Sequence, residues 1–248
     1  MNILILAGGY GTRLYPLIID KPKALLDVNN RALIDYAVER VIHWPDVNII
    51  YVVTNNKFYQ HLKDWAKGQK KILEKICIVN DKTETPETRL GSIGDINFVL
   101  KNEKPDDDLL VMGSDNLFDY ALDDFITFAR KNSPSGTIGL YDIRELEGAK
   151  KFGVVALDHK GKILSFEEKP KEPKSSLIAM CLYYFPKKTL GLIQEYLIES
   201  RKSDMAGDYI RWLCGRQDVY GFKFSGLWFD IGSIESYQEA QKYFKPKP

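Results

Sequence analysis

The chain has 248 residues, of which 44% are hydrophobic and 28% are charged, as in an ordinary globular protein. Its 35 Lys and Arg nearly balance its 34 Asp and Glu, so the formal net charge is +1. Nucleic acids and anionic membranes are normally met by a clear excess of Lys and Arg, so this balance argues against both as partners. Any anion that the protein binds must be held by local charge.

The spacing of the cysteines and histidines, and the lack of a long apolar run, argue against further classes of protein. The three cysteines, Cys77, Cys181 and Cys214, lie far apart, which argues against a disulfide framework or a zinc cluster. The three histidines are scattered and form no metal-binding tract. No apolar run approaches the roughly 20 residues of a membrane span, and the short apolar start lacks the pattern of a signal peptide. We therefore expect a soluble, cytoplasmic protein.

Apolar runs rich in Val and Ile alternate with helix-period segments in the first half of the chain. This pattern is typical of parallel strands covered by helices. Apolar residues recur on one face in residues 31–43 and 121–130, which predicts two helices. The acidic stretch 106–108 is interpreted as a solvated turn without a function. The predicted strands span residues 2–7, 48–54, 75–80 and 108–113.

From residue 137 onward, strand-like segments follow one another with fewer helices between them, as in a second lobe on a shared sheet. A hairpin turn is predicted between Asp158 and Gly161, where glycine can take a positive φ. Ser233 is a predicted cap for the last helix. Together these segments predict an α/β fold. The strands are expected at 137–143, 152–158, 162–167 and 178–185, and the helices at 187–199, near 208–216 and at 234–244.

The most informative segment is the glycine-rich loop after the first strand. Gly8, Gly9 and Gly11 allow the backbone to approach a bulky anion and to point N–H groups at it. Arg13 and Lys23 add fixed positive charge, so the set suits a triphosphate. A dinucleotide fingerprint would need glycine in place of the residue that follows Arg13, and a Walker A motif needs GK[ST], which is absent. A glycine-rich turn remains the alternative, but it leaves the added cations unexplained.

Several motifs, taken in order, resemble one family. Residues 6–28, LAGGYGTRLYPLIIDKPKALLDV, resemble the signature of the sugar-1-phosphate nucleotidyltransferases, or NDP-sugar pyrophosphorylases, in particular the glucose-1-phosphate thymidylyltransferase type. The resemblance implies a Rossmann-like mixed, mainly parallel sheet flanked by helices, with a sugar-binding lobe inserted on the same sheet. It implies one domain over 1–244, with a nucleotide-binding half to about 136 and a sugar-phosphate half from about 137. The other motifs are LGSIG (90–94), VMGSDN (111–116), FGVV (152–155), FEEKP (166–170) and WFDIG (228–232).

The chemistry implied by this resemblance is Mg²⁺-dependent. A sugar 1-phosphate attacks the α-phosphorus of a nucleoside triphosphate, giving an NDP-sugar and pyrophosphate. By matching position, Arg13, Lys23 and Asp115 would be catalytic, and Asp115 and Asp230 would hold the metal. Mg²⁺ in proteins is commonly bound by one or two carboxylates together with substrate phosphates and water. The implied nucleotide-binding residues are Leu6, Ala7, Gly8, Gly9, Gly11, Thr12 and Gly91, and the sugar-phosphate-binding residues are Gly153, Glu168, Lys169 and Trp228.

Departures from the family pattern leave the substrates open. Met180 and Cys181 stand where Thr or Ala and then Gly are common, so the sugar is not defined. Asp95 stands where a small apolar residue is usual, and it either alters base or ribose contacts or caps a helix. Overall likeness favours dTTP or UTP. The alternatives are cytidylyl or guanylyl transfer to another phosphorylated acceptor, or a nucleotide-binding regulator without turnover. A homo-oligomer is also left open.

Overall fold

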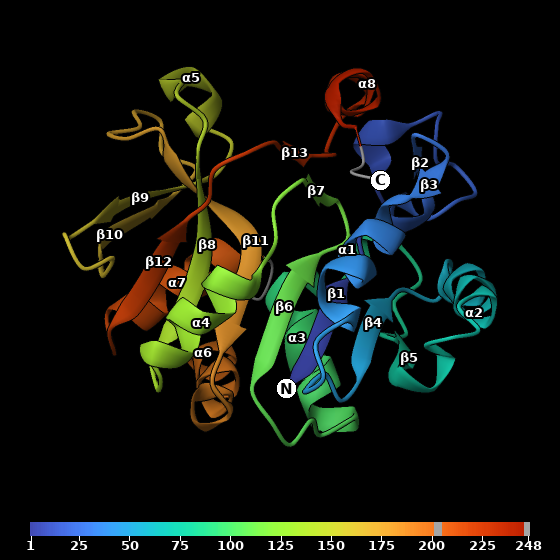
Figure 1. Cartoon of the computed structure of the whole chain (residues 1–248), viewed down its shortest axis with the longest axis horizontal. Helices are drawn as coiled ribbons and strands as arrows, with labels where there is room; N and C mark the ends of the chain where they lie inside the picture. Colours follow the sequence, from blue (N-terminus) through green and yellow to red (C-terminus); the bar gives the residue numbers. More distant parts are fainter. Residues whose placement is uncertain (201–204, 246–248) are drawn as a thin grey trace.

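The computed structural model describes residues 1–200 and 205–245, and its centre is a nine-stranded mixed sheet (Figure 1). Seven strands are neighbours in the order β10-β9-β11-β6-β1-β4-β5, while β8 pairs with β11 and β12 pairs with β8. The predicted α/β class is confirmed. The strands are β1 (Asn2–Leu6), β4 (Ile50–Thr54), β5 (Ile76–Asn80), β6 (Leu109–Gly113), β8 (Gly136–Asp142), β9 (Gly153–Leu157), β10 (Ile163–Glu168), β11 (Leu177–Phe185) and β12 (Val219–Lys223).

The first half of the chain forms the parallel part of this sheet. β5, β4, β1 and β6 run parallel, and each of these strands was predicted to within two residues. Residues 3–5 of β1 are fully buried, as expected for a strand covered by helices on both faces. Because parallel strands end at the same edge, the loops that follow β1 and β6 emerge side by side.

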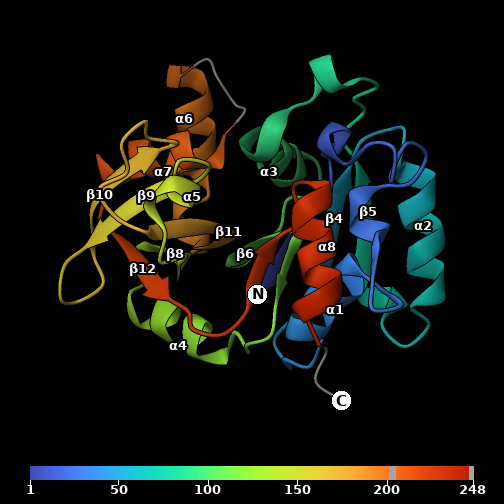
Figure 2. The ribbon, with the colours of Figure 1, turned by 90° about the horizontal axis from the view of Figure 1, so that it is seen from above.

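Helices cover both faces of the sheet (Figure 2), with α3, α6 and α7 on one face and α1 and α4 on the other. The predicted helices are confirmed, except that the segment predicted at 187–199 divides into a 3-10 turn at Lys187–Thr189 and α6. Helices α2, α3 and α5 were not delimited from sequence. The helices are α1 (Leu33–Ile42), α2 (Tyr59–Gly68), α3 (Gly91–Asn102), α4 (Asp123–Lys131), α5 (Leu146–Ala149), α6 (Gly191–Ser200), α7 (Ala206–Cys214) and α8 (Ile234–Tyr243).

Two local predictions are confirmed in atomic detail. β9 and β10 form an antiparallel hairpin whose turn contains Gly161 at φ +84°, and Asp158 accepts hydrogen bonds from the backbone N–H groups of Lys160 and Lys162. The Ser233 hydroxyl accepts a hydrogen bond from the Ser236 N–H at 3.3 Å and so caps α8. Both features depend on residues close in sequence.

A small antiparallel ribbon joins the two halves above the sheet (Figure 1). It pairs β7 (Asn116–Phe118) with β13 (Trp228–Asp230), and places Asp230 opposite Asn116. The Ile231 N–H donates to the Asp115 carbonyl at 3.0 Å, which continues the contact. A second ribbon pairs β2 (Asp27–Val28) with β3 (Arg31–Ala32) beside α8. The remaining 3-10 turns are Thr12–Leu14, Lys23–Leu25, Leu73–Lys75 and Pro86–Thr88.

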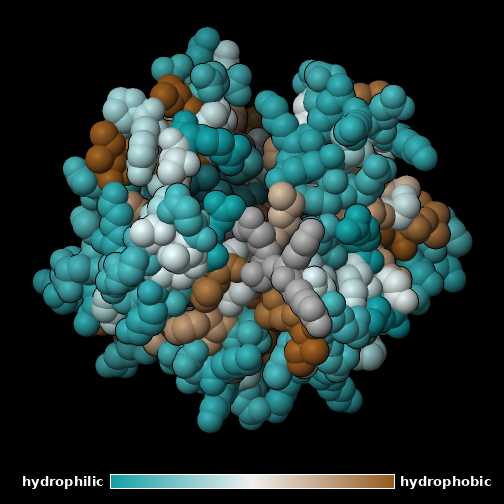
Figure 3. Space-filling model, turned by 180° about the vertical axis from the view of Figure 1, so that it is seen from behind, coloured by the Kyte–Doolittle hydropathy of each residue, from teal (hydrophilic) through white to brown (hydrophobic). Residues whose placement is uncertain are grey.

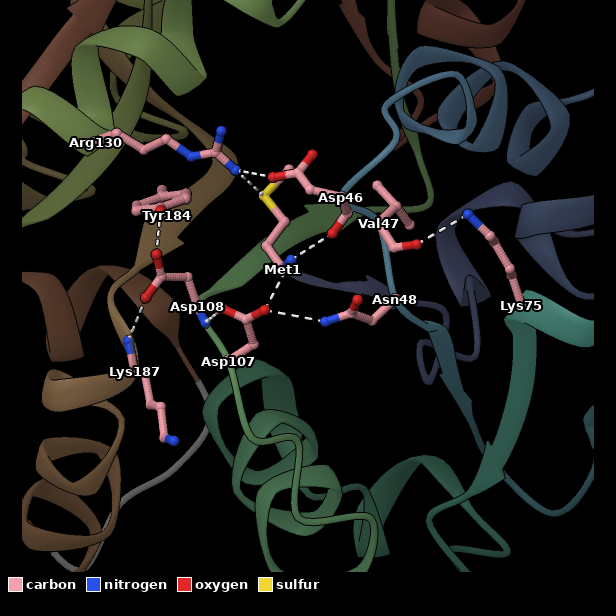
Figure 4. A network of polar contacts seen from close by, with 10 residues as sticks. All are labelled: Met1, Asp46, Val47, Asn48, Lys75, Asp107, Asp108, Arg130, Tyr184 and Lys187. Carbon is pink, nitrogen blue, oxygen red and sulfur yellow. Dashed lines mark hydrogen bonds and ion pairs between the residues drawn. The ribbon is translucent and has the colours of Figure 1, made fainter.

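A polar network ties the strands together at the end of the sheet opposite this ribbon (Figure 4). Asp108 accepts hydrogen bonds from the Tyr184 hydroxyl and from the Lys187 N–H, while Asp107 forms an ion pair with the Met1 amino group at 3.0 Å. Asp106 pairs with Lys187 at 2.6 Å. The predicted turn is present and Asp106 is exposed, but Asp107 and Asp108 also connect β6 to β1 and β11, a structural role that the sequence did not indicate.

The surface opposite that of Figure 1 is mainly hydrophilic, with small separated apolar patches and a recess between the lobes in its upper half (Figure 3). Exposed large apolar side chains, such as Leu164 and Ile198, are scattered over the fold. Within the described residues, no helix combines the length and apolar character needed to cross a bilayer.

Candidate active site

A cleft of about 400 Å³ opens at the edge where β1 and β6 end and takes its walls from both halves of the chain. The glycine-rich loop and the start of α3 border one side, and the β10 end and the start of α7 border the other. Five predicted site residues are not among those that line the cleft: Ala7, Gly11, Thr12, Arg13 and Lys23. The predicted site residues that line it are Leu6, Gly8, Gly9, Gly91, Asp115, Gly153, Glu168, Lys169, Trp228 and Asp230.

The loop after β1 requires glycine at two positions. Gly11 has φ +62°, and a Cβ there would overlap the Ile18 side chain, so another residue would be strained as well as crowded. An ideal Cβ on Gly8 would lie 2.5 Å from Asp95 Oδ2. The buried Asn55 side chain donates to the Gly8 carbonyl at 3.0 Å and anchors the loop to the end of β4. Asn55 belongs to none of the motifs and was missed from sequence.

Asp115 lies two residues after the end of β6 and is paired with a cation. Its Oδ2 is 2.6 Å from Lys23 Nζ, and its Oδ1 accepts a hydrogen bond from the Asn116 side chain at 3.0 Å. Burial raises the pKa of Asp115, but the charge of Lys23 and the hydrogen bonds from Lys23, Asn116 and the backbone together hold this pKa below its ordinary value. Gly113 leaves room for this arrangement, since a Cβ there would be 2.7 Å from Asp115 Oδ1. An ionised Asp115 is therefore secured beside the glycine-rich loop.

Asp230 reaches the same place from the far end of the sequence through the β7–β13 ribbon. Burial and the neighbouring Asp115 carboxylate raise the pKa of Asp230 to about 6, although Lys23, Arg13 and Lys169 oppose the rise. The Arg13 guanidinium lies near, because a Cβ on Gly232 would be 3.4 Å from Arg13 Nη2. Two adjacent carboxylates with excess negative charge form a donor set that a divalent cation fits. Among the described residues, no group of three or more His, Cys, Asp or Glu could hold a metal.

The opposite wall of the cleft presents Glu168 and Lys169 at the end of β10. Lys169 has φ +46°, and its ammonium lies 3.9 Å from Glu168 Oε1. Burial raises the pKa of Glu168, against the effect of Lys169. Gly207 in α7 lies against Glu168, and a Cβ there would overlap the Glu168 carboxylate unless that side chain moved. Trp228 of β13 donates from Nε1 to the Asn116 side chain of β7 at 2.8 Å, a hydrogen bond within the ribbon.

Two further carboxyls, Asp81 and Asp95, line the cleft beneath Gly8. The suggestion that Asp95 caps a helix is wrong, because α3 begins at Gly91 and Asp95 lies in its second turn. Asp81, which follows β5, was missed because no motif surrounds it. Cys181 and Tyr183 of β11 also line the cleft; only Cys181 was noted from sequence, as a departure from the family pattern.

The comparison with protein families decides the relationship that the motifs predicted. The family model described as nucleotidyl transferase matches residues 2–246, which is nearly the whole chain. The chain belongs to the nucleotidyl transferase family. The resemblance to sugar-1-phosphate nucleotidyltransferases, and with it the prediction of an enzyme of that family, is confirmed.

Relatives of this nucleotidyl transferase carry several names. This chain is 29% identical over its whole length to the bifunctional protein GlmU of Methanocaldococcus jannaschii, and the match covers 55% of that protein. It is 29% identical to a glucose-1-phosphate adenylyltransferase of Fervidobacterium nodosum, over 96% of this chain and 59% of the relative. The chain thus spans little more than half the length of these curated relatives.

Solved structures share the fold of this nucleotidyl transferase. A candidate glucose-1-phosphate thymidylyltransferase of Bacillus anthracis, crystallised with sucrose, has a TM-score of 0.84 at 25% identity, over 98% of this chain and 94% of the other. A UDP-glucose pyrophosphorylase complexed with UDP-glucose has a TM-score of 0.81 at 23% identity, over 97% of both chains. The predicted sheet architecture of the nucleotide-diphospho-sugar transferase type is thereby confirmed.

Proposed function

We propose that the protein transfers a nucleotidyl group from a nucleoside triphosphate to a sugar 1-phosphate and releases pyrophosphate. The observation that carries this proposal is the pair of adjacent carboxylates, Asp115 and Asp230, beside Lys23 at the edge of the sheet. The pair lies between a glycine-rich loop suited to a triphosphate and a wall with Glu168 and Lys169. We also propose that these two sides correspond to a nucleotide half and a sugar-phosphate half of one domain.

Asp115 and Asp230 fit Mg²⁺, which commonly takes one or two carboxylates together with substrate phosphates and water. When bound, the ion supplies positive charge against the phosphate oxygens. Coordination would also offset the repulsion between the two carboxylates, which raises the pKa of Asp230 in the free protein.

The residues of the chain provide alignment and charge. An oxygen of the acceptor phosphate forms a bond to the α-phosphorus as the bond to the β-phosphate oxygen breaks. That acceptor is already an anion, so no general base is needed. Arg13 would hold the departing phosphates, Lys23 the α-phosphate and Lys169 the acceptor phosphate, while Glu168 would accept hydrogen bonds from sugar hydroxyls. Transfer of this kind depends mainly on positioning and electrostatic stabilisation.

Pyrophosphate release from combinations of five nucleoside triphosphates with a panel of phosphorylated acceptors tests this proposal. We expect turnover with at least one sugar 1-phosphate, lost on chelation of Mg²⁺. Asp115→Asn and Asp230→Asn should each lower kcat/KM by about 10²–10³-fold, as for loss of a group acting in the transition state. Asp64→Asn, on the exposed face of α2, is the matched control and should not change it.

Other outcomes distinguish the alternatives. Turnover only with acceptors that are not sugars, such as phosphocholine, would replace the sugar 1-phosphate with another phosphorylated acceptor. Nucleotide binding without turnover of any acceptor would instead support a regulator and contradict the proposed activity. The relatives and solved structures described above include adenylyl and thymidylyl transfer and a complex with UDP-glucose, so their names do not select one base.

A further inference from the structure

Two buried carboxyls lie together at one end of the cleft. The side chains of Asp81, after β5, and Asp95, in α3, meet beneath Gly8, whose ideal Cβ would be 3.3 Å from Asp81 Oδ2 and 2.5 Å from Asp95 Oδ2. The two residues are only 4% and 6% exposed, yet both line the cleft. Carboxyl groups are rarely buried without a partner, so this juxtaposition calls for a function.

The pair is rich in acceptors and poor in donors. Asp81 Oδ1 accepts hydrogen bonds from the N–H and the hydroxyl of Thr83, both at 2.7 Å. Asp81 and Asp95 lie within hydrogen-bonding reach of each other, so a proton on one carboxyl can be shared with the other. Asp95 Oδ1 is buried and has no partner. Burial and the charge of Asp81 raise the pKa of Asp95 to about 8, consistent with a single shared proton near neutral pH. The remaining carboxyl lone pairs, those of Asp95 Oδ1 among them, can accept hydrogen bonds from a ligand in the cleft.

The position of the pair indicates which part of a nucleotide it meets. Lys23 and Arg13, the cations suited to phosphates, lie beside Asp115 and Asp230 rather than beside Asp81 and Asp95. Negative phosphates are repelled by an acidic end, so this end can accept only the uncharged nucleoside part of a nucleotide, the base or the ribose. Arg89 lines the cleft here too, but it is exposed at the rim while the carboxyls are buried.

Bases differ in what they present to such acceptors. Guanine offers a ring N–H and an amino group side by side, and adenine and cytosine each offer an amino group. Uracil and thymine carry only one donor on this edge, a ring N–H flanked by two carbonyl oxygens. When one carboxyl oxygen accepts from that N–H, the other carboxyl lone pairs face a carbonyl oxygen. A carboxylate accepts hydrogen bonds and repels another acceptor, so the pair discriminates against uracil and thymine.

We propose that Asp81 and Asp95 read the nucleobase and select a nucleoside triphosphate whose base carries an exocyclic amino group over UTP and dTTP. This role rests on the proposed function, because it requires a nucleotide in the cleft. It replaces the expectation of dTTP or UTP that overall likeness favoured. The selectivity comes from residues of this chain that depart from the family pattern or lie outside its motifs.

Binding and turnover of GTP, ATP, CTP, UTP and dTTP test the inference. Calorimetric titration of each nucleotide into the intact protein requires no acceptor, so it decides base preference even if the proposed activity is absent. We expect the preferred nucleotide to carry an amino group and to bind at least tenfold more tightly than both UTP and dTTP. Equal or tighter binding of UTP or dTTP would overturn the inference without affecting the proposed transfer. Absence of turnover with every combination of nucleotide and acceptor would contradict the proposed transfer, and the base preference measured by binding would still stand.

Analogues and variants identify the groups responsible. ITP differs from GTP, and purine riboside triphosphate from ATP, only by the missing amino group, so the analogue of the preferred purine should bind at least tenfold more weakly. Asp81→Asn replaces an acceptor with a donor and should reduce the preference over UTP at least tenfold, as should Asp95→Asn. Glu84→Gln is the matched control, since Glu84 is exposed, bonds to Asn56 and does not line the cleft. Unchanged preference in both cleft variants, each folded by circular dichroism, would overturn the assignment to this pair.

Discussion

At the scale of single residues, the four aspartates that line the cleft differ through their neighbours. Lys23 lies against Asp115 and lowers its pKa, whereas burial and a second carboxyl raise the pKa of Asp95 and of Asp230. The same side-chain type thus provides an ionised group beside the glycine-rich loop and a proton-sharing pair beneath it. Charge within a few ångströms controls these differences, so the composition of the chain does not reveal them.

The Asp81–Asp95 pair should make folding stability depend on pH. The pKa of Asp95 is about 8 in the folded chain and near its ordinary value of 3.8 in the unfolded chain. Between these values the folded state binds more protons, so the free energy of unfolding falls as pH rises. One such site contributes a slope of at most about 1.4 kcal/mol per pH unit. Asp95→Asn should remove this contribution.

Urea unfolding at pH 5, 6, 7 and 8 measures this effect. The wild-type protein should lose more stability across the series than Asp95→Asn, and the difference should be largest at pH 8. The exposed Glu84→Gln variant controls for removal of a charge from the Asp81 segment and should follow the wild type. Parallel curves for wild type and Asp95→Asn would show that this carboxyl does not bind an additional proton in the folded state.

At the scale of elements, local signals predicted most strands and helices. The β9–β10 turn and the Ser233 cap follow from Gly161 and from the serine itself, because both interactions span only a few residues. The importance of glycines at contacts between elements could not be predicted from the sequence. Gly113 and Gly207 are notable only because β6 and α7 each approach a carboxylate closely, and that proximity depends on packing.

Gly207→Ala tests how α7 positions Glu168. The new methyl group would overlap the Glu168 carboxylate, and this flexible side chain can move away at little cost to folding. We expect the KM of the phosphorylated acceptor to rise about tenfold, since an acceptor contact is lost, while the nucleotide KM stays constant. Stability should change by less than about 1 kcal/mol, because alanine favours a helix. Gly191→Ala in α6 is the control, since its methyl group would meet nothing within 4 Å. A rise in the nucleotide KM alone would contradict the acceptor role of Glu168.

At the scale of the whole molecule, the sheet separates two polar regions. The cleft occupies the end where β1 and β6 finish, and the network around Asp108 occupies the other end (Figure 4). The network joins strands from both halves of the chain, so it stabilises the shared sheet without contacting the cleft. We infer that its residues affect folding and leave substrate affinity unchanged.

Asp108→Ala should therefore destabilise the protein by about 1–3 kcal/mol, because the Tyr184 hydroxyl and the Lys187 N–H both lose their acceptor. Denaturant unfolding measures the loss, and the KM of both substrates should remain at the wild-type value. Asp106→Ala is the control, because its salt bridge with Lys187 is exposed and should contribute little. A change in KM at constant stability would contradict the separation of the two ends.

The sequence by itself determined the α/β class, most element positions, the glycine-rich loop and the family. These properties are encoded in hydrophobic periodicity, in turn and cap residues and in ordered motifs, each of which lies within a short stretch of chain. The positions of Arg13, Lys23 and Asp115 could be named from the motifs alone.

Only the tertiary structure decided which carboxyls meet. Asp230 reaches Asp115 through the pairing of β13 with β7, and Asp95 meets Asp81 because α3 packs beside the end of β5. Contacts between residues distant in sequence depend on how the sheet is assembled, and no local pattern encodes them. The pKa values of these groups follow from the same contacts, since burial and neighbouring charge exist only once the chain has folded.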